Sequence, residues 1–478
     1  MRNEVGDRTE RDMVTRVIMC LALAIACTSV RASAEPNVII ILADDLGYGD
    51  VGYAAAGEKD MVTPNIDRLA ESGVQFTSGY AMHAVCGPSR AGLLTGRYQQ
   101  RFGYHDNIGP RVRESGIERG LPLDEKTFGD HFQQLGYVTG MIGKWHDGDE
   151  DKFWPRHRGF DETYAFNNGA ANYFIGPKNN TRRTPKWGAV HRNGRRLPAF
   201  DEYLTDAFGR ESVEFVERHK DEPFCLYLAF NAVHGPMQAT QRDLDRFAHI
   251  ENRDRRTCVA MNYNMDLNIG RILDRLDTLG LAEKTLVFFY GDNGGSGMPK
   301  NSSNRPLRGY KGETFEGGIR VPFLVQWKGT IPAGKILDEP VIAMDIVATA
   351  LKAAGFKRDV APNLEGVDLM PYMTGTRTSL KDRYLFWDNS VNWAVRDREW
   401  KLVSTHSRDG ARGKRVNGLF KLSDDVSESK ELTGKYPKVA KRLETALEQW
   451  RAENETPRFG WGAHVGPSVG YRGKFLPK

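Results

Sequence analysis

Apolar residues in this chain fall into two kinds of segment. Short runs rich in β-branched and aromatic residues predict buried strands, and they lie at 38–43, 137–142, 224–230 and 285–290. Segments with apolar residues at a helical period lie between or after these runs, at 63–72, 127–135, 202–220, 256–279 and 344–354. Strands that alternate with helices predict an α/β fold with a large, mostly parallel sheet sandwiched by helices.

The pattern changes after about residue 380. Short strands are predicted at 384–387, 393–396, 400–404 and 420–422, and a helix follows at about 439–452. This order predicts a small antiparallel sheet with one packed helix. We therefore expect a large α/β domain at 35–380 and a C-terminal α+β subdomain at 381–478, with no assignment for the tail after Pro457.

The first 34 residues predict an export signal. Charged residues end at Arg16, an apolar run of 11 residues follows from Val17 to Cys27, and small residues then lead to a cleavage site after Ala34. The run is too short to span a membrane, and no later segment is apolar for long enough. We expect a periplasmic or secreted protein. A lipoprotein anchored at Cys27 is the less favoured alternative, because Ala24 stands where Leu is expected.

Composition narrows the functional classes only slightly. Of the five cysteines, Cys86, Cys225 and Cys258 remain after signal removal, which excludes a disulfide framework but leaves a bridge between the last two undecided. The formal net charge is +5, and no basic run with interleaved aromatic residues indicates nucleic-acid binding. Such a mild positive excess would not repel an anionic substrate.

Charged and other strongly polar residues follow the predicted strands closely. They are Asp44, Asp45, Lys144, His146, His234, Asp292 and Asn293. Because the carboxyl ends of parallel strands meet at one edge of a sheet, we expect these side chains to converge there. An extended backbone would also place Lys144 and His146 on the same side, facing one anion. Each residue taken alone has an ordinary alternative as a turn former or a solvated side chain.

Four of these residues suit a metal ion. Asp44, Asp45, Asp292 and Asn293 offer only oxygen atoms, which favours a hard cation such as Ca²⁺ or Mg²⁺ over zinc. Spacing alone does not separate the two ions.

Cys86 opens the sequence Cys-Gly-Pro-Ser-Arg-Ala-Gly-Leu-Leu-Thr-Gly-Arg. Pro88 suits a first helical turn and Arg90 lies one turn beyond Cys86, so the cysteine would stand at the positive end of a helix beside a cation. These residues alone indicate an activated thiolate nucleophile. The alternative is a buried cysteine without chemistry.

The stretch from Cys86 to Arg97 closely resembles the signature of the type I sulfatases. Ala-Asp-Asp-Leu-Gly, Gly-Lys-Trp-His and Gly-Asp-Asn-Gly also resemble motifs of this family, in its arylsulfatase and N-acetylgalactosamine-6-sulfatase branch of the alkaline phosphatase superfamily. The likeness covers nearly all of the mature chain. It implies that a maturation enzyme oxidises Cys86 to Cα-formylglycine. It also implies one cation, Ca²⁺ favoured over Mg²⁺, held by Asp44, Asp45, residue 86, Asp292 and Asn293.

The resemblance further implies hydrolysis of sulfate monoesters. One hydroxyl of the hydrated aldehyde would attack sulfur, with Asp292 taking its proton, and His234, assisted by Lys311, would protonate the leaving alcohol. His146 would help the second hydroxyl to expel sulfate. The cationic groups that stabilise the developing charge would be Arg90, Lys144 and Lys311.

Export and the branch of the family make a sulfated glycan the expected substrate. Aromatic residues of the insertion at 147–201 and beside it either stack on sugar rings or pack the insertion; they are Trp145, Trp154, Tyr173, Phe174 and Trp187. Asp147 stands where an apolar residue commonly follows Gly-Lys-Trp-His, and we expect it at the substrate rim. Two alternatives remain: a phosphatase or phosphonate monoester hydrolase of the same superfamily, and a non-catalytic glycan-binding protein with an unmodified Cys86.

Overall fold

The computed structural model describes residues 35–54, 57–108, 118–176, 189–296, 302–357, 361–407 and 414–459. The expected signal segment, Trp187 and the chain after residue 459 lie outside the described residues. Within the described part, no helix is both long and apolar enough to cross a membrane.

A ten-stranded sheet organises the larger part of the molecule, in the order β11-β2-β10-β9-β1-β8-β4-β5-β6-β7. Its five central strands are mutually parallel: β9 (Thr285–Gly291), β1 (Asn37–Ala43), β8 (Phe224–Ala229), β4 (Val138–Lys144) and β5 (Glu162–Phe166). The outer strands are β10 (Phe323–Gln326), β2 (Val74–Phe76), β11 (Lys335–Leu337), β6 (His191–Arg192) and β7 (Arg195–Arg196). β10 runs antiparallel to β9, so the sheet is mixed at its edges.

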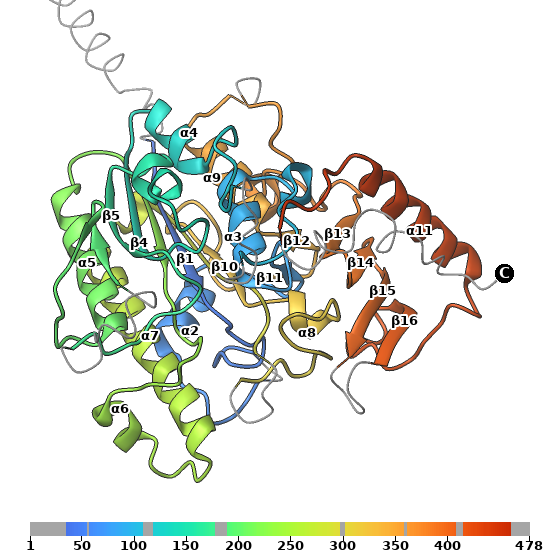
Figure 1. Ribbon diagram of the computed structural model, residues 1–478, viewed down its shortest axis with the longest axis horizontal. Helices are drawn as coiled ribbons and strands as arrows, with labels where there is room; N and C mark the ends of the chain where they lie inside the picture. The colour runs from blue at the N-terminus through green and yellow to red at the C-terminus, as the bar shows by residue number, and fades with distance from the viewer. Residues whose placement is uncertain are drawn as a thin grey trace, which may run out of the picture.

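Helices cover both faces of this sheet, which explains why the strands read as continuous apolar runs (Figure 1). Ile40 and Leu42 of β1 join the apolar cluster on one face, whereas Ile39 and Ile41 join the cluster on the other. The first face carries α3 (Cys86–Thr95), α4 (Phe128–Gln134) and α9 (Met344–Ala353), and the second carries α2 (Pro64–Ser72), α5 (Leu204–Arg218) and α7 (Arg253–Thr278). The expected α/β sandwich is confirmed.

A second, smaller sheet lies beside the first near the C-terminus (Figure 1, orange and red). It is antiparallel and consists of β13 (Leu385–Asp388), β14 (Trp393–Arg396), β15 (Trp400–Ser407) and β16 (Lys414–Lys421), with α11 (Pro437–Ala452) packed on it. The expected strand at 420–422 begins earlier, at Lys414. The start of β16 is exposed and polar, so its apolar pattern is hidden until Leu419.

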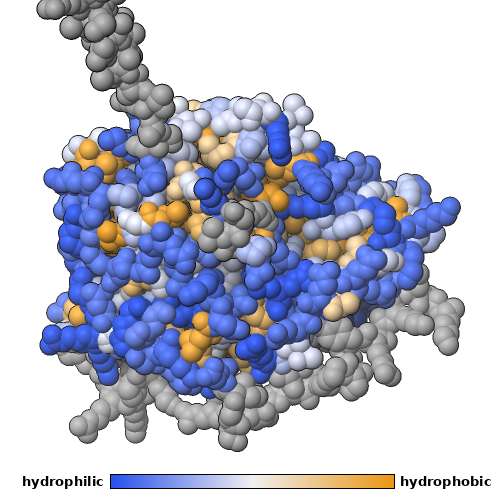
Figure 2. All heavy atoms as spheres, turned by 90° about the horizontal axis from the view of Figure 1, so that it is seen from above, coloured by the Kyte–Doolittle hydropathy of each residue, from blue (hydrophilic) through white to orange (hydrophobic). Residues whose placement is uncertain are grey.

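The remaining short elements connect these layers. They are β3 (Gly79–Tyr80), β12 (Val341–Ile342), α6 (Gln241–Arg246), α8 (Glu316–Ile319) and α10 (Met370–Met373), with 3-10 turns at Gln99–Phe102, Asp151–Phe153, Pro155–His157 and Ala282–Lys284. Cys225 and Cys258 are both buried and unbridged, which decides the open question of a disulfide. The face shown in Figure 2 is mainly hydrophilic, with apolar side chains in scattered small groups.

A buried ion cluster joins the two sheets. Lys401 of β15 is fully buried, and its ammonium lies 2.9 Å from carboxylate oxygens of both Glu316 and Glu428. Glu428 also accepts a hydrogen bond of 2.6 Å from the backbone N–H of Glu316, which begins α8. The C-terminal part is therefore attached to the larger part by desolvated charges as well as by apolar packing.

Candidate active site

The carboxyl edge of the central strands carries the acidic residues. Side chains alternate along a strand, so Asp44 follows Ile40 and Leu42 on the face that α3 covers, and Asp292 follows Phe288 and Tyr290 on the same face. Cys86 begins α3, whose residues are all buried. The fold therefore places the helix start against the two strand ends.

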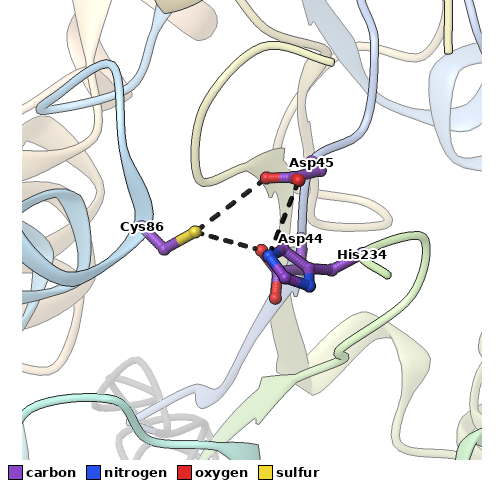
Figure 3. A group of neighbouring side chains, drawn as sticks. All are labelled: Asp44, Asp45, Cys86 and His234. Carbon is purple, nitrogen blue, oxygen red and sulfur yellow. Dashed lines mark hydrogen bonds and ion pairs between the residues drawn. The ribbon is translucent and has the colours of Figure 1, made fainter. Parts of the chain in front are cut away.

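Cys86 points toward the two aspartates and His234 (Figure 3). Its Sγ lies 3.4 Å from Oδ1 of Asp44 and 3.9 Å from Oδ1 of Asp45. Nε2 of His234 lies 3.8 Å from Oδ2 of Asp45. One potential ligand atom from each of these four residues lies within 4.8 Å of the others, a spacing compatible with one shared ion.

Asp292 and Asn293 complete the oxygen-rich group. The backbone N–H of Asp45 donates a hydrogen bond of 3.2 Å to Oδ1 of Asp292, and Nδ2 of Asn293 donates one of 2.7 Å to Oδ1 of Asp45. Oδ1 of Asn293 is buried and has no hydrogen-bond partner among the described residues. A buried acceptor without a partner beside three carboxylates fits a hard cation, because oxygen atoms are the ligands of Ca²⁺ and Mg²⁺.

Three cationic side chains surround the carboxylates. Nε and Nη2 of Arg90 donate to Oδ2 of Asp292 at 3.0 and 2.9 Å, and Nη1 donates to the backbone oxygen of Lys144 at 2.7 Å. Nζ of Lys144 lies 2.5 Å from Oδ2 of Asp44. Nζ of Lys311 lies 2.6 Å from Oδ1 of Asp45 and 3.0 Å from Sγ of Cys86. The cluster therefore presents both signs of charge around residue 86.

The electrostatics of the cluster correct one expectation from the sequence. Burial raises the pKa of the Cys86 thiol to about 12, although Lys144 and Lys311 oppose the shift. An unmodified Cys86 is therefore a neutral thiol at neutral pH, and the helix start does not make it an activated thiolate.

The pKa values of Asp292 and Asp44 are shifted in opposite directions. Burial, with Asp44 nearby, raises the pKa of Asp292 to about 7. Although burial opposes ionisation of Asp44, Lys144, His234 and Arg90 hold its pKa well below the ordinary range. Asp292 is thus the carboxyl group in this cluster whose proton exchange falls near neutral pH.

His234 and His146 differ in how their rings and backbone are arranged beside the cluster. Nδ1 of His234 lies 2.6 Å from the backbone oxygen of Gly235, which leaves Nε2 toward Asp45. His146 has a φ of +67°, and Gly143 before it has a φ of +117°, so the extended backbone expected from Lys144 to His146 is wrong. Nδ1 of His146 is buried without a partner among the described residues, and burial together with Lys144 holds its pKa well below the ordinary value. Burial also lowers the pKa of His234, although Asp45 and Asp44 oppose this shift.

Asp147 does not lie at a substrate rim. Its side chain is fully buried, and its carboxyl group interacts with the hydroxyl group of Tyr104. Burial raises its pKa to about 8. The expectation that Asp147 touches the substrate is therefore wrong, because the turn after His146 directs this side chain into the protein.

The described aromatic residues in and beside the insertion pack against protein groups. Trp145 and Tyr173 are fully buried, and the indole N–H of Trp145 donates to the backbone oxygen of Phe153 at 2.9 Å. The Trp154 ring packs edge-on against His191 at 4.2 Å between centroids, and Phe174 packs against Tyr203 at 5.2 Å. Packing is thus the observed arrangement for these four side chains.

Supporting contacts around residue 86 were missed from the sequence. Oδ1 of Asn107 accepts a hydrogen bond of 2.8 Å from the N–H of Gly87, and Nδ1 of His83 accepts one of 3.2 Å from the N–H of Val85. Nδ2 of Asn392, in the C-terminal part, donates at 2.9 Å to the backbone oxygen of Gly312, next to Lys311. These residues lie in loops or turns, where no periodic pattern marks them.

The doubly covered parallel sheet, with acidic and basic groups gathered at its carboxyl edge, is that of an alkaline phosphatase-like hydrolase. A family model described as Sulfatase matches residues 36–356. The chain is 34% identical over 373 residues to the N-acetylgalactosamine-6-sulfatase of Canis lupus familiaris, covering 74% of this chain and 69% of that one. It is 32% identical over 473 residues to the arylsulfatase A of Bos taurus, covering 90% and 89%.

A solved structure agrees with these relatives. Ps i-CgsB in complex with k-i-k-neocarrahexaose superposes with a TM-score of 0.81 at 34% identity, covering 90% of this chain and 96% of that one. The chain belongs to the sulfatase family, and it is a sulfuric ester hydrolase.

Proposed function

We propose that this protein is an exported sulfatase that removes sulfate from a sulfated glycan, using Cα-formylglycine at residue 86 and one divalent cation, with Ca²⁺ favoured over Mg²⁺. The observation that carries the proposal is the contact of Cys86 with Asp44, Asp45 and Lys311 at the start of a buried helix. The start of a helix and the nearby cationic side chains would stabilise the negative charge of a sulfate ester at residue 86 during binding and hydrolysis.

Asp44, Asp45, Asp292, Asn293 and the oxygen of residue 86 would hold the cation. The unpartnered Oδ1 of Asn293 is the feature of this chain that most directly supports an oxygen-ligated ion. When bound, the ion would withdraw electron density from a sulfate oxygen and offset the charge of the carboxylates.

As an aldehyde hydrate, residue 86 would supply one hydroxyl that bonds to sulfur as the S–O bond to the leaving alcohol breaks. Loss of the proton from its second hydroxyl would then expel sulfate and form the aldehyde again. Asp292 would accept the proton of the attacking hydroxyl, because burial and the nearby Asp44 make its carboxylate more basic than an ordinary aspartate. Arg90 holds Asp292 through two hydrogen bonds and so orients the base.

The remaining residues stabilise charge and move protons. Lys144 and Lys311, one on each side of the acidic pair, would bind the sulfate oxygens as negative charge moves to the leaving alcohol. His234, assisted by Lys311, donates a proton to that alcohol, and His146 takes a proton from the second hydroxyl of residue 86.

The substrate class rests on the names and ligands of similar proteins. One relative is named an N-acetylgalactosamine-6-sulfatase, and Ps i-CgsB was solved with a neocarrahexaose. Both names concern carbohydrates, which supports a sulfated glycan for this chain. The apolar run from Val17 to Cys27, followed by small residues, supports export.

The experiment compares two esters that share one leaving group, 4-nitrophenyl sulfate and 4-nitrophenyl phosphate, on protein coexpressed with a formylglycine-generating enzyme. We expect faster turnover of the sulfate ester and its loss in Cys86→Ala. Faster turnover of the phosphate would favour the phosphatase alternative. Full turnover by Cys86→Ala would exclude residue 86 as the nucleophile, and glycan binding without turnover of either ester would indicate a binding protein.

A further inference from the structure

The C-terminal sheet reaches the loop that carries Lys311. Asn392, in the turn between β13 and β14, donates from Nδ2 to the backbone oxygen of Gly312 at 2.9 Å. The backbone N–H of Thr314 donates to Oγ1 of Thr405 in β15 at 3.2 Å. The end of this sheet is therefore part of the surroundings of the catalytic cluster, one residue away from Lys311.

An arginine and a histidine lie at the same end of the sheet. Arg415 and His406 are cross-strand partners in β16 and β15. Oδ1 of Asn392 accepts a hydrogen bond of 2.9 Å from the N–H of His406, and Nη2 of Arg415 lies 3.3 Å from Nδ1 of His406. A continuous line of contacts therefore joins Arg415, His406 and Asn392 to Gly312.

The guanidinium of Arg415 is held by neutral acceptors. Nη1 donates to Oγ of Ser404 at 2.6 Å, and Nη2 donates to the backbone oxygen of Val391 at 2.9 Å. These bonds fix the plane of the guanidinium while leaving further N–H groups for a ligand, since an arginine carries five. The residue is exposed.

Arg415 differs from its neighbours in having no acidic partner among the described residues. Arg398 pairs with Glu339 at 2.8 Å, and Arg442 forms an ion pair with Asp397 at 2.5 Å. Partial burial without a compensating acid lowers the pKa of Arg415, which agrees with an unneutralised charge. An oriented arginine without an acidic partner among the described residues, connected through His406 and Asn392 to the loop that carries Lys311, indicates a second anionic group on the substrate.

We propose that Arg415, with His406 beside it, binds a second sulfate or carboxylate of a polyanionic glycan whose scissile sulfate lies at residue 86. This assignment rests on the proposed sulfatase function and defines its substrate as an oligosaccharide with at least two anionic groups. A bidentate guanidinium contact fits both anions, so the shared chemistry is an oxyanion on a sugar near the reacting one.

The first test measures binding without turnover. Cys86→Ala and the double variant Cys86→Ala/Arg415→Ala are titrated calorimetrically with sulfated hexasaccharides of the carrageenan, chondroitin sulfate and heparin types. We expect Arg415→Ala to weaken the binding of the preferred hexasaccharide about tenfold, and raised salt to reduce the difference. The matched control is Arg442→Ala, a similarly exposed arginine of the same subdomain that already has an acidic partner. We expect it to leave the dissociation constant within about twofold.

The second test separates this subsite from catalysis. In the otherwise wild-type, matured enzyme, Arg415→Ala should raise KM for the hexasaccharide and leave kcat/KM for 4-nitrophenyl sulfate unchanged. Equal losses on both substrates would assign Arg415 a structural role and overturn the proposal. The proposal would also be overturned if Arg415→Ala left the binding of all three hexasaccharides unchanged in the Cys86→Ala background. A wild-type enzyme that fails to cleave 4-nitrophenyl sulfate would refute the sulfatase proposal, while the binding titrations would still decide whether Arg415 contacts a polyanion.

Discussion

Individual residues at this site differ from their ordinary counterparts because of burial. The thiol of Cys86 and the carboxyl groups of Asp147 and Asp292 all favour the protonated form, since desolvation opposes a charge on each. Asp44 stays ionised only because Lys144, His234 and Arg90 surround it. Residue type and sequence position gave no sign of this division between neutral and charged acids.

Replacing Asp147 with asparagine should change how stability depends on pH. The folded-state pKa of Asp147 is raised to about 8 from an ordinary value near 4, so the folded protein holds a proton that the unfolded chain loses. Asp147 therefore lowers stability progressively as pH rises through this range. The Asp147→Asn variant lacks this titration, and its free energy of unfolding relative to wild type should increase by more than about 1 kcal/mol between pH 5 and pH 8.

Urea unfolding at both pH values measures this difference. Thr95→Val provides a control for a buried polar substitution without titration, and its stability difference from wild type should not vary with pH. An Asp147→Asn difference that stays constant from pH 5 to pH 8 would show that the carboxyl group is ionised in the folded protein.

The position of the Lys311 side chain should depend on Asn392, which lies in the C-terminal part. Asn392→Ala removes the hydrogen bond to the backbone oxygen of Gly312, a bond between neutral groups that contributes about 1 kcal/mol. We expect kcat for 4-nitrophenyl sulfate to fall about fivefold and the melting temperature to fall by only about 2 to 4 °C. In a Lys311→Ala background the same change should have little further effect, because its influence passes through Lys311. Independent, multiplicative losses in the double-mutant cycle would contradict this role.

At the scale of elements, the sequence was most informative where strands and helices are buried and periodic. The limits of α2, α9 and the four strands that carry the site agree with the apolar pattern to within a few residues. Strand order, the antiparallel direction of β10 and the polar beginning of β16 depend on contacts between distant segments, which periodicity does not contain.

Some residues of the candidate site were predicted from the sequence, and others were found only in the folded structure. The turn motifs that follow the strands marked Asp44, Asp45, Asp292 and Asn293, because these residue types recur where strands end. The contacts of Asn107 and Asn392 and the inward turn of Asp147 require the folded backbone, since each depends on a loop that meets a distant element.

At the scale of the whole molecule, the C-terminal sheet is attached through buried charge. Lys401 is fully buried between Glu316 and Glu428, so Lys401→Met would leave the buried Glu428 without a cation and Glu316 paired with Arg320 alone. We expect a loss of about 3 to 5 kcal/mol in the free energy of unfolding. Lys438→Met, at an exposed position of α11, is the matched control and should change stability by less than about 0.5 kcal/mol. Urea denaturation of both variants provides the comparison, and equal stabilities would show that the cluster does not hold the two parts together.

Removal of divalent cations should lower both turnover and stability of the whole protein. Three carboxylates lie close together at the carboxyl edge, and a cation bound there stabilises the folded state by mass action. Dialysis against a chelator should lower the melting temperature by several degrees, and Ca²⁺ should restore it more effectively than Mg²⁺. An unchanged melting temperature, with no metal found by elemental analysis of the active protein, would contradict the metal assignment.

The central claim is that residue 86 acts as an aldehyde and not as a thiol. Peptide mass spectrometry of the active protein measures this directly, in parallel with sulfate release from 4-nitrophenyl sulfate. We expect the peptide containing residue 86 to be lighter than the cysteine form by about 18 Da, and sulfate release to rise in proportion to the converted fraction. Full sulfate release by protein in which Cys86 remains entirely a thiol would show that the aldehyde is not required for catalysis.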